Sequence, residues 1–505
     1  MMTNNEILEV YNQGPASVVE LVKGLFAKID DLVAENKALR EEIAELKAEN
    51  KVLRQEIVQL KTEVKKLKDQ INQNSNNSSK PPSCDGFKKI PNLRQKSGKP
   101  TGGQIGHQGY TLRQTSNPDY VQVYKLPACP YCNSSLVDVN PQGYTARQVF
   151  DIPPVKIEVT EHRAEIKRCP HCGKTGQAEF LAGIEQPVQY GQRIKALATY
   201  LTQYQLIPLD RTCELLSDVL DTPISEGTLV NINNRCYAKL ESAETQIMGQ
   251  LKASKILNND ETGCSIEGRR YWLHVASNDK LTHYAVHNKR GSQATGDIGI
   301  LPGFRGTAVH DYWKAYLKYD NCSHALCNAH HLRALTGIEE NDNQQWPKQM
   351  KQLLLKMKEE VDTLRGSTNR LPDNMIAELE KQYNDIVAAG IQEDTAANGA
   401  YLATGKRGRE KRSKARNLLD RFTEHKKEIL AFMYDFNVPF DNNQAERDLR
   451  MTKVQQKISG GFRSTQGANV FCRIRGYIST VKKNAQNVLD ALAQAFDNRP
   501  FVPEV

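Results

Sequence analysis

Three acidic side chains lie far apart in the chain, at positions where regular elements begin or end. Asp260 and Asp311 each close a short β-strand pattern, and Glu446 lies within 441–447, a segment typical of a helix start. Carboxylates bind Mg²⁺, and two such ions stabilise both the attacking and the leaving oxygen of an in-line phosphoryl displacement. The three acids therefore predict a Mg²⁺ (or Mn²⁺) site for phosphoryl transfer on nucleic acid. The competing acidic candidates are Glu261, Asp297, Asp320 and Asp448.

The elements that must position these acids follow an α/β pattern. Three consecutive strand patterns, followed by alternating helices and strands, match the ribonuclease H-like order, in which the first and fourth strands are neighbours. We therefore expect Asp260 and Asp311 to face each other, and a later helix to bring in Glu446. The core is predicted in two parts, 254–340 and 439–490. The five expected strands are Ile256–Asp260, Arg270–Ala276, Leu281–Val286, Gly306–His310 and His324–Cys327.

An all-helical insertion is predicted between the two parts of the core, over 341–438, because Trp346–Tyr434 carries a helical apolar pattern. Its basic stretch, Lys406–Arg416, has seven positive charges and one negative, which favours contact with a polyanion over a merely solvated loop. A second basic stretch follows Glu446. The expected DNA-binding residues are Lys406, Arg407, Arg409, Lys411, Arg412, Lys414, Arg447, Arg450 and Lys457.

Two Cys-x-x-Cys turns predict a structural zinc ribbon over 119–185. Each turn aims two thiolates at one point, and two such turns complete a tetrahedral Zn²⁺ site. The runs Tyr120–Tyr124 and Lys156–Val159 are interpreted as ribbon strands, and His171 is not expected to be a ligand. A redox role would need a thioredoxin-like unit, which the pattern does not show. The four expected zinc ligands are Cys129, Cys132, Cys169 and Cys172.

The segment 22–71 predicts a leucine-zipper coiled coil. Leucine recurs every seventh residue from Leu25 to Leu67, and the other core position is mostly Val or Ile, with Asn36 and Asn50 as polar exceptions. This pattern favours a parallel dimer whose register is fixed by asparagine. We expect a homodimer. A different partner chain, or packing of the helix on its own globular domain, remains open.

Two further segments are expected between the zipper and the core. The polar, proline-containing segment 72–118 is predicted to be a basic flexible linker, which either follows a phosphate backbone or acts only as a solubilising tether. Residues 190–250 predict a helical, helix-turn-helix-like DNA-binding domain, in which Ser225 caps the third helix. A small helical bundle explains the same pattern equally well.

Composition sets the broad class of the protein. At 505 residues the chain is long enough for several domains, and its net charge of +9 is modest for that length. It has no run of eighteen apolar residues and no apolar signal region, which predicts a cytoplasmic, nucleoid-associated protein without a membrane partner. Eleven cysteines, an odd count, argue against a disulfide framework.

Five motifs, in order along most of the chain, resemble the transposases of insertion sequence 66 elements. The resemblance implies a DDE transposase with Asp260, Asp311 and Glu446 as its acids, and it agrees with the zinc-ribbon interpretation. Cys327 and His330 are similar to a motif of related enzymes and are expected to support the metal site or the DNA, unless they only begin a packed helix. The motifs are Asn77–Ser83, Gly102–His107, Asp260–Gly263, Cys327–Arg333 and Asp441–Arg447.

The expected activity is Mg²⁺-dependent hydrolysis of a phosphodiester at each element end, followed by transfer of the freed 3′-OH into target DNA. The expected partners are the terminal repeats, the target DNA and a second copy of the chain, with possible accessory transposition proteins. The alternatives are a nuclease or resolvase on the same fold that does not join DNA, and a catalytically inactive DNA-binding regulator. The chain ends at Phe501–Val505, without the C-terminal extension that the resemblance leads us to expect.

Overall fold

A computed structural model describes residues 2–78, 106, 111–153, 155–342, 344–398 and 412–504. The chain forms two compact units. The first comprises Met1–Lys88 with Glu340–Asn343, and the second comprises Lys89–Glu339 with Gln344–Val505. No helix in the described ranges is both long enough and apolar enough to cross a membrane.

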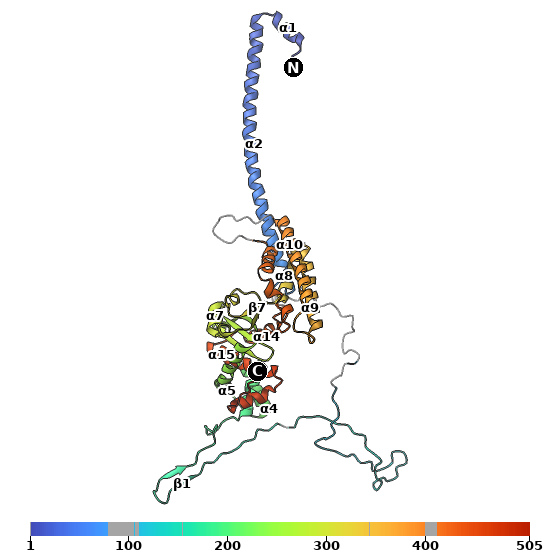
Figure 1. Ribbon diagram of the computed structural model, residues 1–505, viewed down its shortest axis with the longest axis vertical. Coiled ribbons are helices and arrows are strands. Elements are labelled where there is room, and N and C mark those ends of the chain that lie inside the picture. The colour runs from blue at the N-terminus through green and yellow to red at the C-terminus, as the bar shows by residue number, and fades with distance from the viewer. Residues whose placement is uncertain are drawn as a thin grey trace. The chain divides into compact units, whose positions relative to one another are not determined.

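The first unit is dominated by one long helix. A short helix, α1 (Asn4–Asn12), precedes α2 (Pro15–Asn72), which runs without interruption for 58 residues (Figure 1). Proline fits the first turn of α2, where its missing N–H would have no helical partner. The predicted zipper is therefore helical throughout, and the helix begins before the first heptad. Its heptad leucines stay about half exposed in the single chain, from Leu25 at 49% to Leu67 at 56%.

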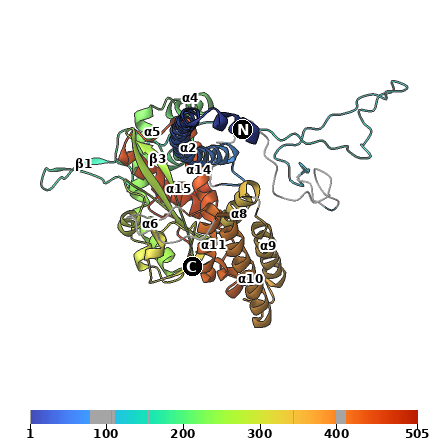
Figure 2. The same ribbon diagram turned by 90° about the horizontal axis from the view of Figure 1, so that it is seen from above.

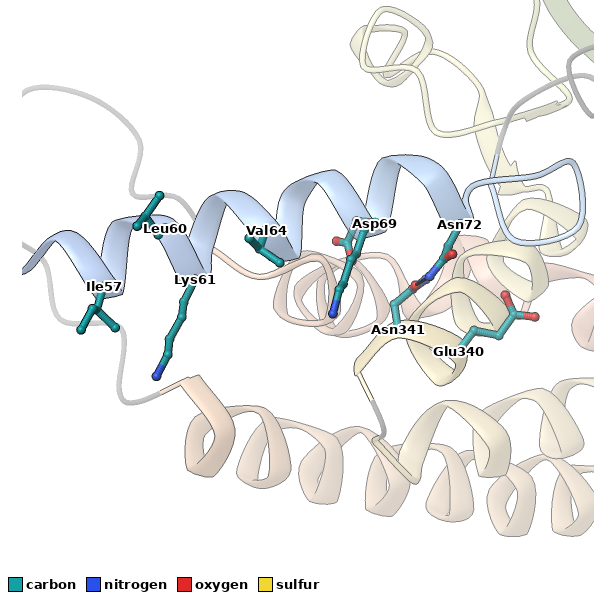
Figure 3. A pocket seen from close by; sticks show the side chains of 9 residues that line it. Ile57, Leu60, Lys61, Val64, Asp69, Asn72, Glu340 and Asn341 are labelled. Carbon is teal, nitrogen blue, oxygen red and sulfur yellow. Dashed lines mark hydrogen bonds between the residues drawn. The ribbon is translucent and has the colours of Figure 1, made fainter. Parts of the chain in front are cut away.

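The end of α2 is held by an asparagine-rich turn. The Asn72 Nδ2 donates to Asn341 Oδ1 at 3.4 Å, and the Asn77 Nδ2 donates to Glu340 Oε2 at 2.6 Å. Beside these contacts, the heptad residues Ile57, Leu60 and Val64 line a pocket with Asn72, Glu340 and Asn341 (Figure 3). The first residues of the predicted linker are thus ordered by side-chain hydrogen bonds. Most of segment 72–118 lies outside the described residues.

A five-stranded mixed sheet forms the centre of the second unit. Its order is β5-β4-β3-β6-β7, so the first and fourth core strands are neighbours, as predicted. β3 is antiparallel to β4, which is antiparallel to β5, while β3, β6 and β7 are parallel. The strands are β3 (Ile256–Ile266), β4 (Arg269–Ser277), β5 (Thr282–His287), β6 (Thr307–His310) and β7 (Ser323–Leu326).

Helices cover both faces of the sheet. On one face, α14 (Asn443–Ser459) and α15 (Thr465–Lys483) pack on β3, β4 and β5 (Figure 2). Their core contains side chains such as Leu273, Val275 and Leu449. On the other face, α6 (Glu241–Ala253), α7 (Ser292–Ile298) and the turns η3 (Leu301–Gly303) and η4 (Tyr316–Lys318) share a core with Ala276. Strand β4 therefore sends alternate residues to opposite cores, as its period of two requires.

The described part of the segment between β7 and α14 is mainly helical, as predicted for the insertion. Its helices share one core, built around Trp346, Tyr383 and Phe422, and this core reaches the sheet at Val309 and Leu326. The insertion is thus anchored to the two strands nearest Asp311. The helices are α8 (Asn328–Asp342), α9 (Trp346–Leu364), α10 (Asp373–Asn398), α11 (Lys414–Glu424), α12 (Lys426–Ile429) and α13 (Ala431–Tyr434).

The helices that precede the sheet pack on the C-terminal helices. The Ser225 hydroxyl accepts the N–H of Thr228, so it caps the third helix as predicted. Asn233 on that helix is buried and donates to the Thr202 hydroxyl, which removes it from any groove-reading face. The core is shared with α15 and α16 (Val488–Phe496). The other elements are α3 (Gln192–Thr199), η2 (Tyr200–Tyr204), α4 (Leu209–Leu220) and α5 (Glu226–Lys239).

The cysteine-containing segment has less regular structure than predicted. Only β1 (Ile166–Arg168) and β2 (Thr175–Gln177) form there, as an antiparallel pair. The runs Tyr120–Tyr124 and Lys156–Val159 were interpreted as strands, and this prediction is wrong. Neither run has a strand partner, and alternation stabilises a strand only when one of its two faces is buried.

Candidate active site

Asp260 and Asp311 share one face of two adjacent parallel strands. The β3–β6 register pairs Asn258 with Val309. Asp260 stands two residues further along β3, and Asp311 stands two residues further on, directly after His310, the last residue of β6. Two residues on, side chains return to the same face, so Asp260 and Asp311 lie next to each other where the β3–β6 pairing ends. Asp260 was predicted to close its strand, and this prediction is wrong. Strand β3 continues past Asp260 to Ile266 as one arm of the hairpin with β4.

The same alternation separates Asp260 from its neighbour. Glu261 points to the opposite face of β3, where its side chain is 1% exposed and accepts from Arg290 Nε at 2.8 Å. The hydroxyl of Tyr316 also donates to this carboxylate. Glu261 is thus buried, and both of its carboxylate oxygens accept hydrogen bonds. Asp260 instead faces α14. Of these two consecutive acids, the structure places only Asp260 on the side of Glu446.

Glu446 sits in the first turn of α14, where a carboxylate also favours the positive end of the helix dipole. Its Oε1 accepts from Arg333 Nη2 at 3.1 Å and lies 3.7 Å from His330 Nδ1. Both partners come from α8, which follows β7. Burial lowers the pKa of His330, as does the positive charge of Arg333. Arg333 therefore holds Glu446 in place, and the His330 ring lies beside it.

The start of α14 is fixed by contacts that Cys327 and Asn442 make. The N–H of Asn442 donates to Cys327 Sγ at 3.1 Å, and its Nδ2 donates to the Asn259 carbonyl at 2.8 Å. Asn442 is 1% exposed, so both bonds are buried. Asn442, rather than Asp441, is the residue before the helix, although Asp441 Oδ1 accepts the N–H of Asn443. Cys327 and Asn442 thus link α14 to the strand that carries Asp260.

The electrostatics of Asp260 differ from those of the competing acids. Burial raises its pKa well above the usual value, and the carboxylates of Glu261, Asp311 and Glu446 raise it further. By contrast, Asp448 lies 2.9 Å from Lys483 and Asp297 lies 3.1 Å from His287. Asp320 is exposed. Among the described residues, no cation forms an ion pair with Asp260 or Asp311.

The three acids approach one another without closing into a compact cluster. In the described part of the chain, one set of three potential metal ligands lies within 4.8 Å of one another, and it consists of Cys327, His330 and Glu446. Glu446 is therefore turned toward α8, while its charge still acts on Asp260. The structure brings the predicted catalytic and supporting residues together at one edge of the sheet.

The predicted DNA-binding residues fall into three groups. Arg447, Arg450 and Lys457 are exposed on α14, and no described carboxylate forms an ion pair with them. Arg412 pairs with Asp420 at 2.6 Å, and Lys414 is exposed at the start of α11. The remaining four predicted residues, Lys406, Arg407, Arg409 and Lys411, lie outside the described residues.

The two Cys-x-x-Cys turns have matching backbone structure. Asn133 N–H donates to the Cys129 carbonyl, and Gly173 N–H donates to the Cys169 carbonyl, each at 2.9 Å. Asn133 and Gly173 both have positive φ, 60° and 69°, which these two residue types tolerate best. Hydrogen bonds lower the pKa of Cys132 to about 7 and also lower that of Cys169. Each turn thus presents one thiol of lowered pKa, although the four sulfurs are not gathered within 4.8 Å.

Comparison with protein families decides the relationship. A family model described as "Transposase IS66 family" matches residues 187–470, more than half of the chain. The chain belongs to the IS66 transposase family. A second model, the "zinc-finger binding domain of transposase IS66", matches residues 127–173 and supports structural zinc on the four cysteines of this transposase. A third, a family of unknown function, matches residues 30–113. A search of curated proteins found no match.

The sequence alone did not identify three residues that define the site of this IS66 family member. Arg333 and Asn442 stood inside recognised motifs, but their roles depend on contacts with Glu446 and Asn259 that only the fold supplies. Arg421 lies outside every motif. The one indication in the sequence is that Arg421 is a basic residue close to the apolar residues Leu418, Leu419 and Phe422, which are buried on α11.

Proposed function

We propose that the chain is a DDE-type DNA transposase with a ribonuclease H-like catalytic core. One observation carries this proposal: Asp260 on β3 and Asp311, directly after the adjacent strand β6, stand side by side on the face where α14 supplies Glu446. Membership of a transposase family gives this arrangement its substrate class, which is DNA. The order of the five strands supports the ribonuclease H-like assignment.

The donor set fits a hard divalent cation. Asp260 and Asp311 offer oxygen ligands without a described cation partner, and neighbouring carboxylates raise the pKa of Asp260. Mg²⁺ prefers a few carboxylates together with water and substrate phosphate oxygens. Asp260, Asp311 and Glu446 would hold Mg²⁺ or Mn²⁺, which supplies electrophilic stabilisation of the phosphate and a bound water of lowered pKa.

The surrounding residues prepare this site for an in-line displacement. Arg333 orients Glu446, and Asn442 fixes the start of its helix against β3. Trp313 N–H donates to Asp311 Oδ1 at 3.1 Å, which orients the second acid. In the first step a water oxygen attacks phosphorus and the 3′-oxygen of the element end leaves. In the second step that 3′-hydroxyl attacks a target phosphodiester, so that one bond forms as one breaks.

DNA contact is assigned to the exposed basic side chains near these acids. Arg447, Arg450 and Lys457 follow the exposed face of α14 away from Glu446, at the helical spacing that keeps them in one line. A line of cations matches a phosphate backbone, which supplies affinity and register and carries no sequence information. The zinc segment and the helices 192–253 are the candidates for recognition of the element ends.

A strand-transfer assay tests this function. Pre-cut duplexes that carry the terminal repeat of the element are incubated with the full chain, Mg²⁺ and a supercoiled target. We expect products in which the 3′ end is joined to target DNA. Cleavage of uncut ends without any joining would replace the transposase with a nuclease or resolvase. Binding of the ends with neither reaction would indicate a DNA-binding regulator.

A homodimer through α2 is the proposed arrangement that brings two element ends together. The apolar heptad side chains of α2 stay about half exposed, including Ile57, Leu60 and Val64 (Figure 3). Asn36 and Asn50 donate to carbonyls four residues earlier, at 3.1 Å each, which keeps these polar core positions satisfied. Such a helix gains stability by burying its apolar stripe against a second copy.

Substitution of two heptad leucines checks this arrangement. We expect the full chain to have a solution mass of twice its own 56.9 kDa in light scattering. Leu39→Glu with Leu46→Glu places charge in the seam and should reduce the mass to that of one chain at micromolar concentration. Lys37→Glu, one residue past a seam position, serves as the matched control and should leave the mass unchanged. An unaltered mass in the double variant would exclude α2 as the interface.

A further inference from the structure

Arg421, on helix α11 of the insertion, differs from the other partly buried arginines of the second unit. Arg290, Arg333 and Arg473 each lie within 3.1 Å of a carboxylate oxygen. The buried Arg475 instead donates to the backbone carbonyls of Gln203 and Tyr204. Arg421 forms no ion pair with any described carboxylate, and its Nε is buried without a hydrogen-bond partner there. Burial lowers its pKa, since a buried guanidinium without a counter-ion is unfavourable.

The position of Arg421 places this unpaired charge beside the catalytic acids. Its guanidinium carbon lies 4.1 Å from the ring centroid of Tyr312, the residue directly after Asp311. The Tyr312 side chain and, more weakly, the Asp311 carboxylate oppose the lowering of the pKa of Arg421, and Arg421 in turn lowers the pKa of His330. The insertion thus delivers one positive charge to the sheet edge that carries Asp311.

Tyr312 is held in an unusual conformation to form this platform. Its φ is 76°, a left-handed value that a bulky residue adopts only when its surroundings enforce it. His425 packs against its ring at 5.1 Å, edge to face, and Arg421 covers it. Tyr312, the strained residue next to Asp311, thus places its aromatic ring under the guanidinium of Arg421.

We propose that Arg421 binds a phosphate of the DNA backbone next to the catalytic acids, as a substrate contact supplied by the insertion. This inference rests on the proposed function, because the DNA substrate is the anion which that function brings to Asp311. Guanidinium groups bind phosphate oxygens through paired N–H donors, and the bound phosphate would supply the counter-ion that no described carboxylate provides. The insertion therefore contributes a phosphate-binding residue to the site that the strands and α14 form.

Two substitutions separate this role from a structural one. Arg421→Met keeps the length of the side chain and removes its charge, and Arg421→Lys keeps the charge without the paired donors. Arg365→Met, at the end of α9 in the same insertion, is the matched control because Arg365 pairs with Asp362 at 3.9 Å. We expect Arg421→Met to slow single-turnover cleavage by about 100-fold, with a melting temperature equal to or above that of the wild type. The cleavage rate of Arg421→Lys should lie between those of the wild type and Arg421→Met, and Arg365→Met should cleave at the wild-type rate.

A charge-neutralisation scan identifies the contacted phosphate. Duplexes with one methylphosphonate at each linkage around the cleavage point are tested for binding and for cleavage. At one linkage, the methylphosphonate should strongly weaken binding and cleavage by the wild type. The same duplex should change binding and cleavage by Arg421→Met by no more than about 2-fold, because that variant has already lost the contact. Equal penalties in both proteins at every linkage would overturn the assignment, as would a large fall in melting temperature in Arg421→Met. If the wild type binds the ends without cleaving them, the proposed function fails, and the binding scan still decides the role of Arg421.

Discussion

Replacing Asp260 with asparagine is expected to abolish both end cleavage and strand transfer, by at least about 1,000-fold. Asparagine keeps the shape of the side chain and removes the negative charge that a divalent ion requires. The measurement is single-turnover cleavage of labelled element ends in Mg²⁺, with joining followed in the same reaction. Asp297→Asn is the matched control, because Asp297 is an exposed acid paired with His287 and should change the rate by less than about 3-fold.

The same substitution is expected to stabilise the protein in the absence of Mg²⁺. Burial and the carboxylates of Glu261, Asp311 and Glu446 raise the pKa of Asp260 above its usual 3.8. A carboxyl whose pKa is raised by folding binds its proton more tightly in the folded state. Stability is therefore lost as the pH rises from about 3.8 through the folded-state pKa. Asparagine does not ionise, so the variant should melt at a higher temperature than the wild type at pH 8.

The stability comparison has a clear internal control. The difference in melting temperature between Asp260→Asn and the wild type should shrink as the pH falls to 3.8 and below, where the carboxyl becomes protonated in both states. Added Mg²⁺ should raise the melting temperature of the wild type more than that of the variant. Unchanged cleavage in Asp260→Asn would remove Asp260 from the catalytic set. A lower melting temperature at pH 8 would mean that its charge is compensated in the folded protein.

Loss of one zinc ligand is the second large effect that we expect. Cys132→Ser should weaken zinc binding by at least about 100-fold, since even residues that merely orient a ligand cost 10–100-fold. Thiols with lowered pKa release their protons readily on binding zinc, and hydrogen bonds lower the pKa of Cys132 to about 7. Because the 127–173 segment has little apolar core of its own, it should lose structure with the metal.

Zinc content after dialysis against a competing chelator measures this effect, together with the affinity for element ends. We expect about one zinc per wild-type chain and far less in Cys132→Ser, with weaker binding of the ends. Cys213→Ser changes a cysteine outside the two turns, and this variant should keep the zinc content of the wild type. A second zinc that disappears only in Cys327→Ser would point to the Cys327, His330 and Glu446 set. Full zinc retention in Cys132→Ser would show that the two turns are not its site.

The sequence predicted the parts of the site that depend on strand order. Three strand patterns followed by alternating elements were sufficient to make the first and fourth strands neighbours, which places Asp260 beside Asp311. The alternation of side chains along β3 then separates Asp260 from Glu261, although the sequence offered both as candidates. Periodicity identifies which residues share a face, and that information is local.

The parts that could not be predicted depend on contacts between distant segments. Arg421 is 110 residues beyond Asp311, and no local pattern shows that α11 packs near β6. The predicted helix-turn-helix segment gave no sign that Asn233 is buried, since its bond to Thr202 and the core shared with α15 depend on the fold. The run Tyr120–Tyr124 alternates like a strand, yet a strand also needs a partner, which alternation does not specify.

The central claim is that Asp260, Asp311 and Glu446 hold the divalent ion that the proposed reaction requires. Anomalous diffraction from crystals of the full chain with bound element ends and Mn²⁺ tests it most directly. We predict an anomalous peak in contact with carboxylate oxygens of Asp260 and Asp311, with Glu446 turned from Arg333 toward the same ion or its neighbour. Mn²⁺ density elsewhere, with none between Asp260 and Asp311, would contradict the account.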